Sequence, residues 1–315
     1  LEGGVTKEIV ASYRVGIVSD FAPSDLDESS RNAALPMPEF RFAKLSAEAN
    51  GEIFSASKLM SYGHSRRDFV NRYVFGLPEE TAEDEPRAAT SESEERIIGS
   101  LAGSVIHAVM EKIPLWLGFA GDVSAEEFDE ATEKALEGLE NVNIELLRDR
   151  VRTECLAVAS TPLLRKWQPQ LGSSLFEYDM FIPVNDDIMM AKIDALMLGP
   201  DGTPEIWDWK TNIVRGREGM AALAAKYAMQ MKVYAYFVML LHPGREAYRA
   251  RLLFTRLAQE AADDESWTWV YSFAKSDLEQ FADFLGETTH RMKAINFINS
   301  GDEIDYSEGQ LEWQI

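Results

Sequence analysis

An aspartate and a lysine stand two residues apart in the segment IWDWKTN. The segment is typical of a β-strand, on which Asp208 and Lys210 would project from one face and Trp209 from the other. A carboxylate beside an ammonium can divide the work of phosphodiester hydrolysis, with Asp208 holding a divalent metal ion and Lys210 orienting or activating the attacking water. The ordinary alternative for a bare Asp-x-Lys pair is a salt bridge.

A second aspartate adds weight to the pair. Asp194, in AKIDALML, falls on the preceding expected strand, and a turn at residues 199–202 would join the two strands as a hairpin and bring both carboxylates together. Two carboxylates are hard oxygen ligands that can share one cation. Asp194 has apolar neighbours in the sequence, and burial of an unpaired carboxylate is costly, which favours a metal ligand or a firm ion pair.

Two more segments could complete such a site. His107 follows Gly103 by one helical turn in GSVIHAVME and could supply a nitrogen ligand or fix a water, although a lone histidine is commonly a core or surface residue. Gln230 and Tyr234 lie one helical turn apart in YAMQMKVYAYF. They could hold Lys210 and a phosphate or stack on a base, or they could line the edge of an ordinary amphipathic helix.

Taken in order, the motifs GSVIH, KID, DWK and QMKVY resemble those of the PD-(D/E)XK nuclease superfamily. More narrowly, they are similar to the RecB-like nuclease domains at the C-termini of AddA, AddB and UvrD-type helicases, and the similarity includes the entry SASKLMSY at residues 55–62. One departure is Ala191, where many relatives carry glycine. The resemblance implies metal ligation by His107, Asp194, Asp208 and the Trp209 carbonyl, and catalysis by Lys210 with Gln230 and Tyr234 in support.

The resemblance also implies a fold and an activity. The fold would be a restriction-endonuclease-like α/β core, a small mixed sheet flanked by helices, with an N-terminal helical extension. The activity would be Mg²⁺- or Mn²⁺-dependent hydrolysis of DNA, as an exonuclease on single-stranded ends supplied by a helicase domain or subunit during recombinational repair. Two alternatives stay open: a catalytically silent DNA-binding or scaffolding module, and a stand-alone exonuclease of phage or CRISPR type.

Several cofactors are not expected. Members of the family with an iron–sulfur cluster place one cysteine after the entry motif and three near the C-terminus, where this chain has GHSRRDF and INSGDEIDYSEGQ without cysteine. No GxxxxGK[ST] motif is present, so no ATP site of that kind is expected. The single cysteine, Cys155, lies in an apolar helical run and is expected to be a buried structural thiol.

The order of elements follows from the hydrophobic periodicity. Residues 1–53 are expected to be a weakly structured segment, residues 54–315 the nuclease domain, and residues 78–96 an acidic mobile loop. A capping box of Ser276 and Glu279 would start the last helix. We expect helices at 55–78, 99–116, 125–168, 221–241 and 276–298, an antiparallel meander of strands at 175–184, 187–198 and 203–211, and a strand pair at 250–257 and 266–273.

The balance of 31 Lys and Arg against 53 Asp and Glu gives a net charge of -22, which argues against a protein that coats a polyanion. Many acids fall in the expected linkers, however, and basic residues gather around the motifs. We expect a local basic track that guides the DNA backbone. Its candidate members are Arg66, Arg67, Arg215 and Lys232.

The remaining expectations concern location. The start LEGGVTKEIV has no initiator Met and no features of a signal peptide, so the chain is expected to be part of a longer protein. No apolar run is long enough for a membrane span. Because a single cysteine excludes an intramolecular disulfide, a reducing, cytoplasmic location is expected.

Overall fold

The computed structural model describes residues 51–77, 91–118, 121–140, 142–199 and 203–296. The expectations for residues 1–50 and 78–90 therefore lie outside the described residues. Within the described part of the chain, a six-stranded mixed sheet forms the centre. Its strands are β1 (Ile53–Ser55), β2 (Leu175–Val184), β3 (Asp187–Leu198), β4 (Pro204–Lys210), β5 (Ala247–Phe254) and β6 (Thr268–Ala274).

The sheet combines the predicted antiparallel pairs with two parallel ones. Strands β2, β3 and β4 form the predicted antiparallel meander, and β5 pairs with β6 antiparallel, also as predicted. The predicted bounds of β5 are wrong at its end, because residues 255–257 begin a 3₁₀ helix, Thr255–Glu260. Strand β4 runs parallel to β5, so the chain must cross over between them, and helix α8 (Gly216–Leu241) makes that crossover. The short strand β1 pairs parallel with the start of β3 and was not predicted.

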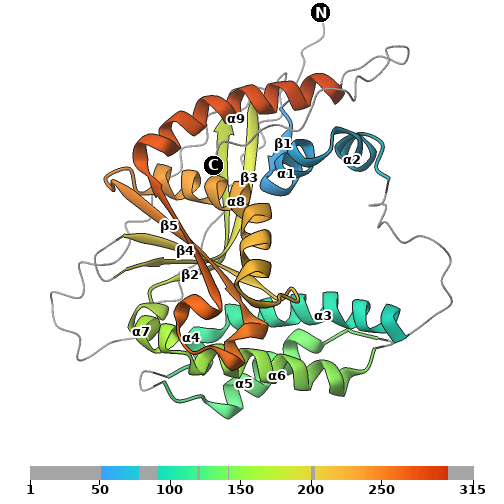
Figure 1. Cartoon of the computed structure of the whole chain (residues 1–315), viewed down its shortest axis with the longest axis vertical. Coiled ribbons are helices and arrows are strands. Elements are labelled where there is room, and N and C mark those ends of the chain that lie inside the picture. The colour runs from blue at the N-terminus through green and yellow to red at the C-terminus, as the bar shows by residue number, and fades with distance from the viewer. Residues whose placement is uncertain (1–50, 78–90, 119–120, 141, 200–202, 297–315) are drawn as a thin grey trace, which may run out of the picture. The chain divides into compact units, whose positions relative to one another are not determined.

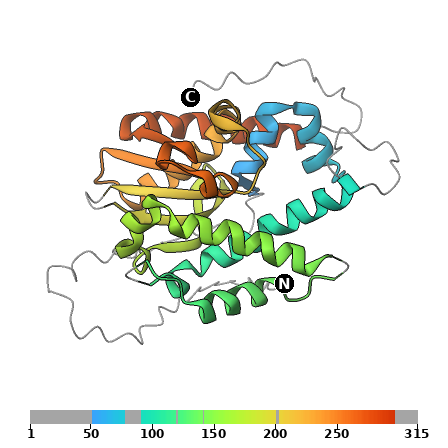
Figure 2. The same cartoon turned by 60° about the horizontal axis from the view of Figure 1, so that its bottom comes forward.

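Helices cover both faces of the sheet (Figures 1 and 2). One buried cluster joins the sheet to α1, α8 and α9, and a second joins its other face to α3 through α7. This arrangement confirms the mixed sheet flanked by helices. Besides α8, the helices are α1 (Ala56–His64), α2 (Arg66–Phe69) with a π-helical turn at Val70–Val74, α3 (Ser91–Glu111), α4 (Ile113–Trp116), α5 (Ala125–Leu136), α6 (Ile144–Ser160), α7 (Pro162–Leu171) and α9 (Lys275–Asn296).

The alternation of side chains along β4 sends neighbouring residues into different layers. Trp207 and Trp209 belong to the cluster under α3 to α7, where their rings pack edge to face with centroids 5.8 Å apart. Ile206 belongs to the cluster under α8. Because side chains two apart share a face of a strand, Asp208 and Lys210 point to the α8 side. Asp208 and Lys210 therefore lie on the face of β4 opposite to the two tryptophans.

Several helix boundaries differ from the predictions; α8, for example, begins at Gly216 rather than at residue 221. Helix α3 begins at Ser91, so the last residues of the segment expected to be an acidic loop are helical. The predicted capping box at Ser276 is wrong, because α9 begins at Lys275, whose amide donates to the Glu246 carbonyl at 3.0 Å as the chain passes directly from β6 into the helix. Ser55 caps α1, and its side chain accepts a hydrogen bond from the Lys58 amide at 3.1 Å.

The described helices do not meet the requirements of a membrane span, since none of them is both long enough and apolar enough to cross a bilayer.

Candidate active site

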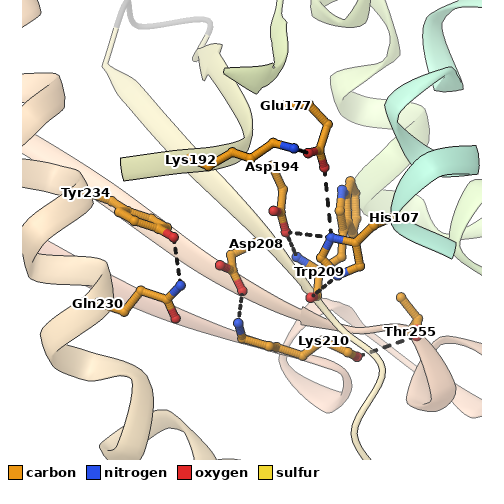
Figure 3. Close-up of polar contacts among 10 residues, drawn as sticks. All are labelled: His107, Glu177, Lys192, Asp194, Asp208, Trp209, Lys210, Gln230, Tyr234 and Thr255. Atoms are coloured by element: carbon orange, nitrogen blue, oxygen red, sulfur yellow. Dashed lines mark hydrogen bonds and ion pairs between the residues drawn. The ribbon is translucent and has the colours of Figure 1, made fainter. Parts of the chain in front are cut away.

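The β3–β4 hairpin brings the two predicted aspartates together. Ala195 pairs with Trp207, and the same register sets Asp194 opposite Asp208. The Asp194 carboxylate accepts a hydrogen bond of 2.7 Å from the Trp209 amide (Figure 3). Asp208 is almost fully buried, at 3% exposure, whereas Asp194 is partly exposed. The hairpin therefore holds two carboxylates of different burial next to each other, with Asp194 partly exposed and Asp208 buried.

His107 reaches this hairpin from α3. Its Nε2 lies 2.9 Å from the Trp209 carbonyl oxygen and its Nδ1 lies 3.4 Å from Asp194 Oδ2. A Cβ atom on Gly103, one turn earlier, would stand 2.9 Å from Thr211 Oγ1, so glycine allows the close approach of α3 to the end of β4. Burial acts to lower the pKa of His107, but Asp194 and, more weakly, Asp208 outweigh burial and raise it.

Glu177 on β2 joins the site, although the sequence did not single it out. Its Oε1 lies 4.0 Å from His107 Nδ1 and its Oε2 lies 2.5 Å from Lys192 Nζ. Its backbone has φ 48°, in the left-handed region that a non-glycine residue rarely adopts. A signal was present: counting back from the two-residue turn at Asn185 and Asp186 places Glu177 opposite Asp194.

The partly exposed side chains of His107, Glu177 and Asp194 offer donor atoms that suit a divalent metal ion. His107, Glu177 and Asp194 each offer one ligand atom, and these atoms lie within 4.8 Å of one another. A nitrogen with two carboxylates is a donor set for a transition or alkaline-earth ion such as Mn²⁺ or Mg²⁺. The Trp209 carbonyl, a predicted ligand, borders the same group but is engaged by His107. Of the predicted ligands, His107 and Asp194 belong to this donor group and Glu177 is added to it, whereas Asp208 lies outside it and pairs with Lys210.

Asp208 faces Lys210 rather than His107. Lys210 Nζ lies 2.5 Å from Asp208 Oδ2 and 3.9 Å from the centre of the Tyr227 ring. Burial raises the pKa of Asp208 to about 6, against the attraction of Lys210. Burial alone would lower the pKa of Lys210, but the charge of Asp208 outweighs burial and raises that pKa. Lys210 is therefore an ammonium at neutral pH, able to offset negative charge and to donate hydrogen bonds.

One face of α8 lies above this pair, as the sequence predicts. Gln230 Nε2 donates to Tyr234 Oη at 2.7 Å, and the pKa of Tyr234 is raised by burial and by the nearby negative charge of Asp208. Tyr227 occupies the same helical face at a spacing of three and seven residues from Gln230 and Tyr234. That spacing is the signal by which Tyr227 could have been found.

The four residues predicted to guide DNA do not gather at the site. Arg66 stacks on Tyr62 of α1, with its guanidinium 4.3 Å from the ring centre, and Arg67 beside it is exposed. Arg215 is exposed in the loop between Lys210 and α8. Lys232 lies over the Phe281 ring of α9 at 5.2 Å, two residues round the helix from Gln230. Of this set, only Arg215 is close to Lys210 in the chain.

Fold and site together define an α/β protein in which a β-hairpin presents carboxylates and a lysine beside a histidine. The sequence matches the family model of the PD-(D/E)XK nuclease superfamily over residues 53–309, and the chain belongs to that superfamily. The chain is also similar to the crystal structure of a candidate exonuclease from Eubacterium rectale, with a TM-score of 0.45 at 13% identity, covering 82% of this chain and 87% of that one. Among curated proteins, no significant match is found.

Proposed function

We propose that this chain is a divalent-metal-dependent deoxyribonuclease. The observation that carries the proposal is the meeting of His107, Asp194 and Glu177 within 4.8 Å, with the Asp208–Lys210 pair one strand away. A cation-binding group beside a buried ammonium is suited to phosphodiester hydrolysis, because both can offset the charge that develops on the phosphate during attack. Membership of a nuclease superfamily supports the same assignment.

The residues would share the work as follows. His107, Glu177 and Asp194 would hold the cation, with Asp208 and the Trp209 carbonyl as further ligands. When bound, the cation supplies Lewis-acid stabilisation of charge on the phosphate. Lys210 would donate a hydrogen bond from Nζ to the reacting phosphate, held in place by Asp208 and Tyr227. Gln230 and Tyr234 would orient the nucleophile from α8.

We place the chain among RecB-like domains, acting as an exonuclease on single-stranded ends that a helicase domain or subunit delivers in DNA end processing. Mg²⁺ or Mn²⁺ would be the cation. Contacts with the DNA backbone would come from Arg66, Arg67, Arg215 and Lys232. The buried free thiol of Cys155 is compatible with a reducing cytoplasm.

A cleavage assay tests the proposal. Purified protein is incubated with end-labelled single-stranded DNA in Mg²⁺, in Mn²⁺ or in EDTA, and Asp208→Ala and Lys210→Ala variants are run beside it. We expect products only with a metal ion and a loss of at least about a hundredfold in each variant. A wild-type chain that binds DNA but cleaves it no faster than the variants would identify a catalytically silent module instead.

A further inference from the structure

A buried carboxylate near the site is shared by two arginines. Glu154 on α6 is 5% exposed, and its Oε1 accepts from Arg150 Nε at 2.8 Å and lies 3.6 Å from Arg256 Nε. Its other oxygen accepts a hydrogen bond of 2.5 Å from Thr255 Oγ1. Both carboxylate oxygens of Glu154 are thus engaged, and its single negative charge faces two guanidinium groups.

Thr255 and Arg256 of this group follow the end of β5, the strand next to the one that carries Lys210. Phe254 pairs in register with Lys210, and Thr255 and Arg256 follow at the same end of the parallel strands β4 and β5. Thr255 Oγ1 is 3.5 Å from the Lys210 carbonyl oxygen (Figure 3). Arg256 therefore lies at the same end of the sheet as Lys210, and Arg150 is joined to it through the shared Glu154 carboxylate on α6.

The charges of the group do not balance. Two guanidinium ions against one carboxylate leave one positive charge, in a chain whose net charge is -22. Within the described part of the chain, Arg150 Nη2 and Arg256 Nε are buried atoms with no hydrogen-bond acceptor. Burial and the repulsion of Arg150 lower the pKa of Arg256. By contrast, Arg148 on the same helix has two carboxylates to itself, those of Glu133 and Glu145.

We propose that Arg150 and Arg256 form a subsite for one backbone phosphate of the substrate strand, adjacent to the phosphate that is cleaved. The proposal rests on the proposed nuclease function. A phosphodiester carries one negative charge and several acceptor oxygens, and the planar guanidinium group matches that geometry. Both side chains keep some exposure, 16% for Arg150 and 29% for Arg256, so an anion can approach the groups from solvent, although Arg150 Nη2 and Arg256 Nε themselves are buried. Glu154 holds the two guanidinium groups side by side.

If the group had a purely structural role, only one of the two arginines would be needed. One arginine is enough to neutralise Glu154, and the Thr255 hydroxyl already links α6 to the end of β5. The second arginine adds repulsion, and each arginine has a buried donor without an acceptor among the described residues, which favours an acceptor from outside the chain. The two roles make different predictions, because a phosphate-binding side chain changes the salt dependence of DNA binding and a structural one changes only stability.

The test measures binding of a short fluorescent single-stranded oligonucleotide in EDTA, by anisotropy, from about 50 to 200 mM KCl. Removing one arginine that binds a phosphate of a single strand should reduce the slope of log K against log salt by about 0.7. We expect this reduction for Arg256→Gln and for Arg150→Gln. Arg256→Lys should keep the slope, because the charge remains. Arg148→Gln, which removes an equal charge from the same helix, should leave the slope unchanged.

The outcomes separate this inference from the proposed function. Melting temperatures measured for all variants identify any that are merely unfolded, and Arg256→Lys offers a mild second substitution. If the Arg150 and Arg256 variants lower the melting temperature but keep the wild-type slope, while the wild type cleaves DNA, the subsite is overturned and the nuclease stands. If the wild type neither binds nor cleaves DNA, both proposals fail.

Discussion

At the scale of residues, the central feature is a lysine held by its neighbours. Lys210 has 12% of its side chain exposed, with Asp208 on one side and the Tyr227 ring on the other. Holding the ammonium in one place before substrate arrives removes the cost of ordering a long side chain during the reaction. Asp208 holds Lys210 by an ion pair and Tyr227 holds it by contact with the ring, so each interaction can be removed by a separate substitution.

Replacing Tyr227 tests whether its aromatic ring positions Lys210. Tyr227→Phe retains an aromatic ring under Lys210 Nζ and should keep near-wild-type cleavage. Tyr227→Ala removes the cation–π interaction, worth about 0.5 to 2 kcal/mol, and should slow single-turnover cleavage by between about twofold and thirtyfold. Equal rates for the two variants would mean that the ring does not position the lysine.

Glu177 is predicted to be a metal ligand. Because a bound cation stabilises the folded state, Mg²⁺ or Mn²⁺ should raise the melting temperature of the wild-type chain. Glu177→Gln should reduce that increase by removing one carboxylate from the donor group. The control is Asp179→Asn, an exposed acid two residues along the same strand. If Mg²⁺ or Mn²⁺ raises the melting temperature of Glu177→Gln as much as that of Asp179→Asn, Glu177 does not belong to the cation site.

At the scale of elements, the register of the meander assembles the acidic residues. The turn at Asn185 and Asp186 sets Glu177 opposite Asp194, and the next turn sets Asp194 opposite Asp208. A slip of one residue in either pairing would move a carboxylate to the other face of the sheet. Helix α3 then closes against the end of β4, where Gly103 and Thr211 meet.

The close approach of α3 to the end of β4 predicts that alanine substitution has different effects on cleavage at two glycines of α3. Gly103→Ala would place a Cβ atom 2.9 Å from Thr211 Oγ1, push α3 away and displace His107, so metal-dependent cleavage should fall. Gly99→Ala meets nothing within 4 Å and should gain about 1 kcal/mol of helix stability without loss of activity. Adding Thr211→Ala to Gly103→Ala should restore cleavage. Full activity of Gly103→Ala alone would refute the close approach.

The elements that the sequence predicts are those that local patterns define. The hairpin strands at 175–184 and 187–198 follow from β-rich segments around a turn, and their bounds agree with the structure. Strand β1 has only three residues and exists through pairing with β3, more than a hundred residues away, so no local pattern marks it. Glu177 escaped notice because its role depends on register, and the Arg150–Glu154–Arg256 group because α6 meets β5 only in the folded chain.

At the scale of the whole described structure, the site lies where two layers meet. His107 comes from the α3 layer, Tyr227 and Gln230 come from α8 on the other face, and the β3–β4 hairpin lies between them. Neither layer holds the complete set of groups. The geometry of the site therefore depends on the packing of both hydrophobic clusters against one sheet, and loss of either cluster should abolish activity together with folding.

Cys155 offers a probe of that packing. It is the single cysteine of the chain, it is fully buried in the cluster under α3 to α7, and burial raises its thiol pKa. We expect no reaction with a thiol reagent in the native protein and one thiol per chain after denaturation, with a rate that follows global unfolding. Rapid stoichiometric labelling of the native chain would contradict this packing.

The assignment of a nuclease site around Lys210 depends above all on the rate of metal-dependent DNA cleavage, measured in single-turnover conditions for wild type, Lys210→Ala and Lys226→Ala. Lys226 is an exposed lysine on α8, next to Tyr227 in the sequence, and controls for the loss of one positive charge. We predict cleavage by wild type and by Lys226→Ala, and a loss of at least about a hundredfold in Lys210→Ala. Cleavage by Lys210→Ala at the wild-type rate would contradict the assignment.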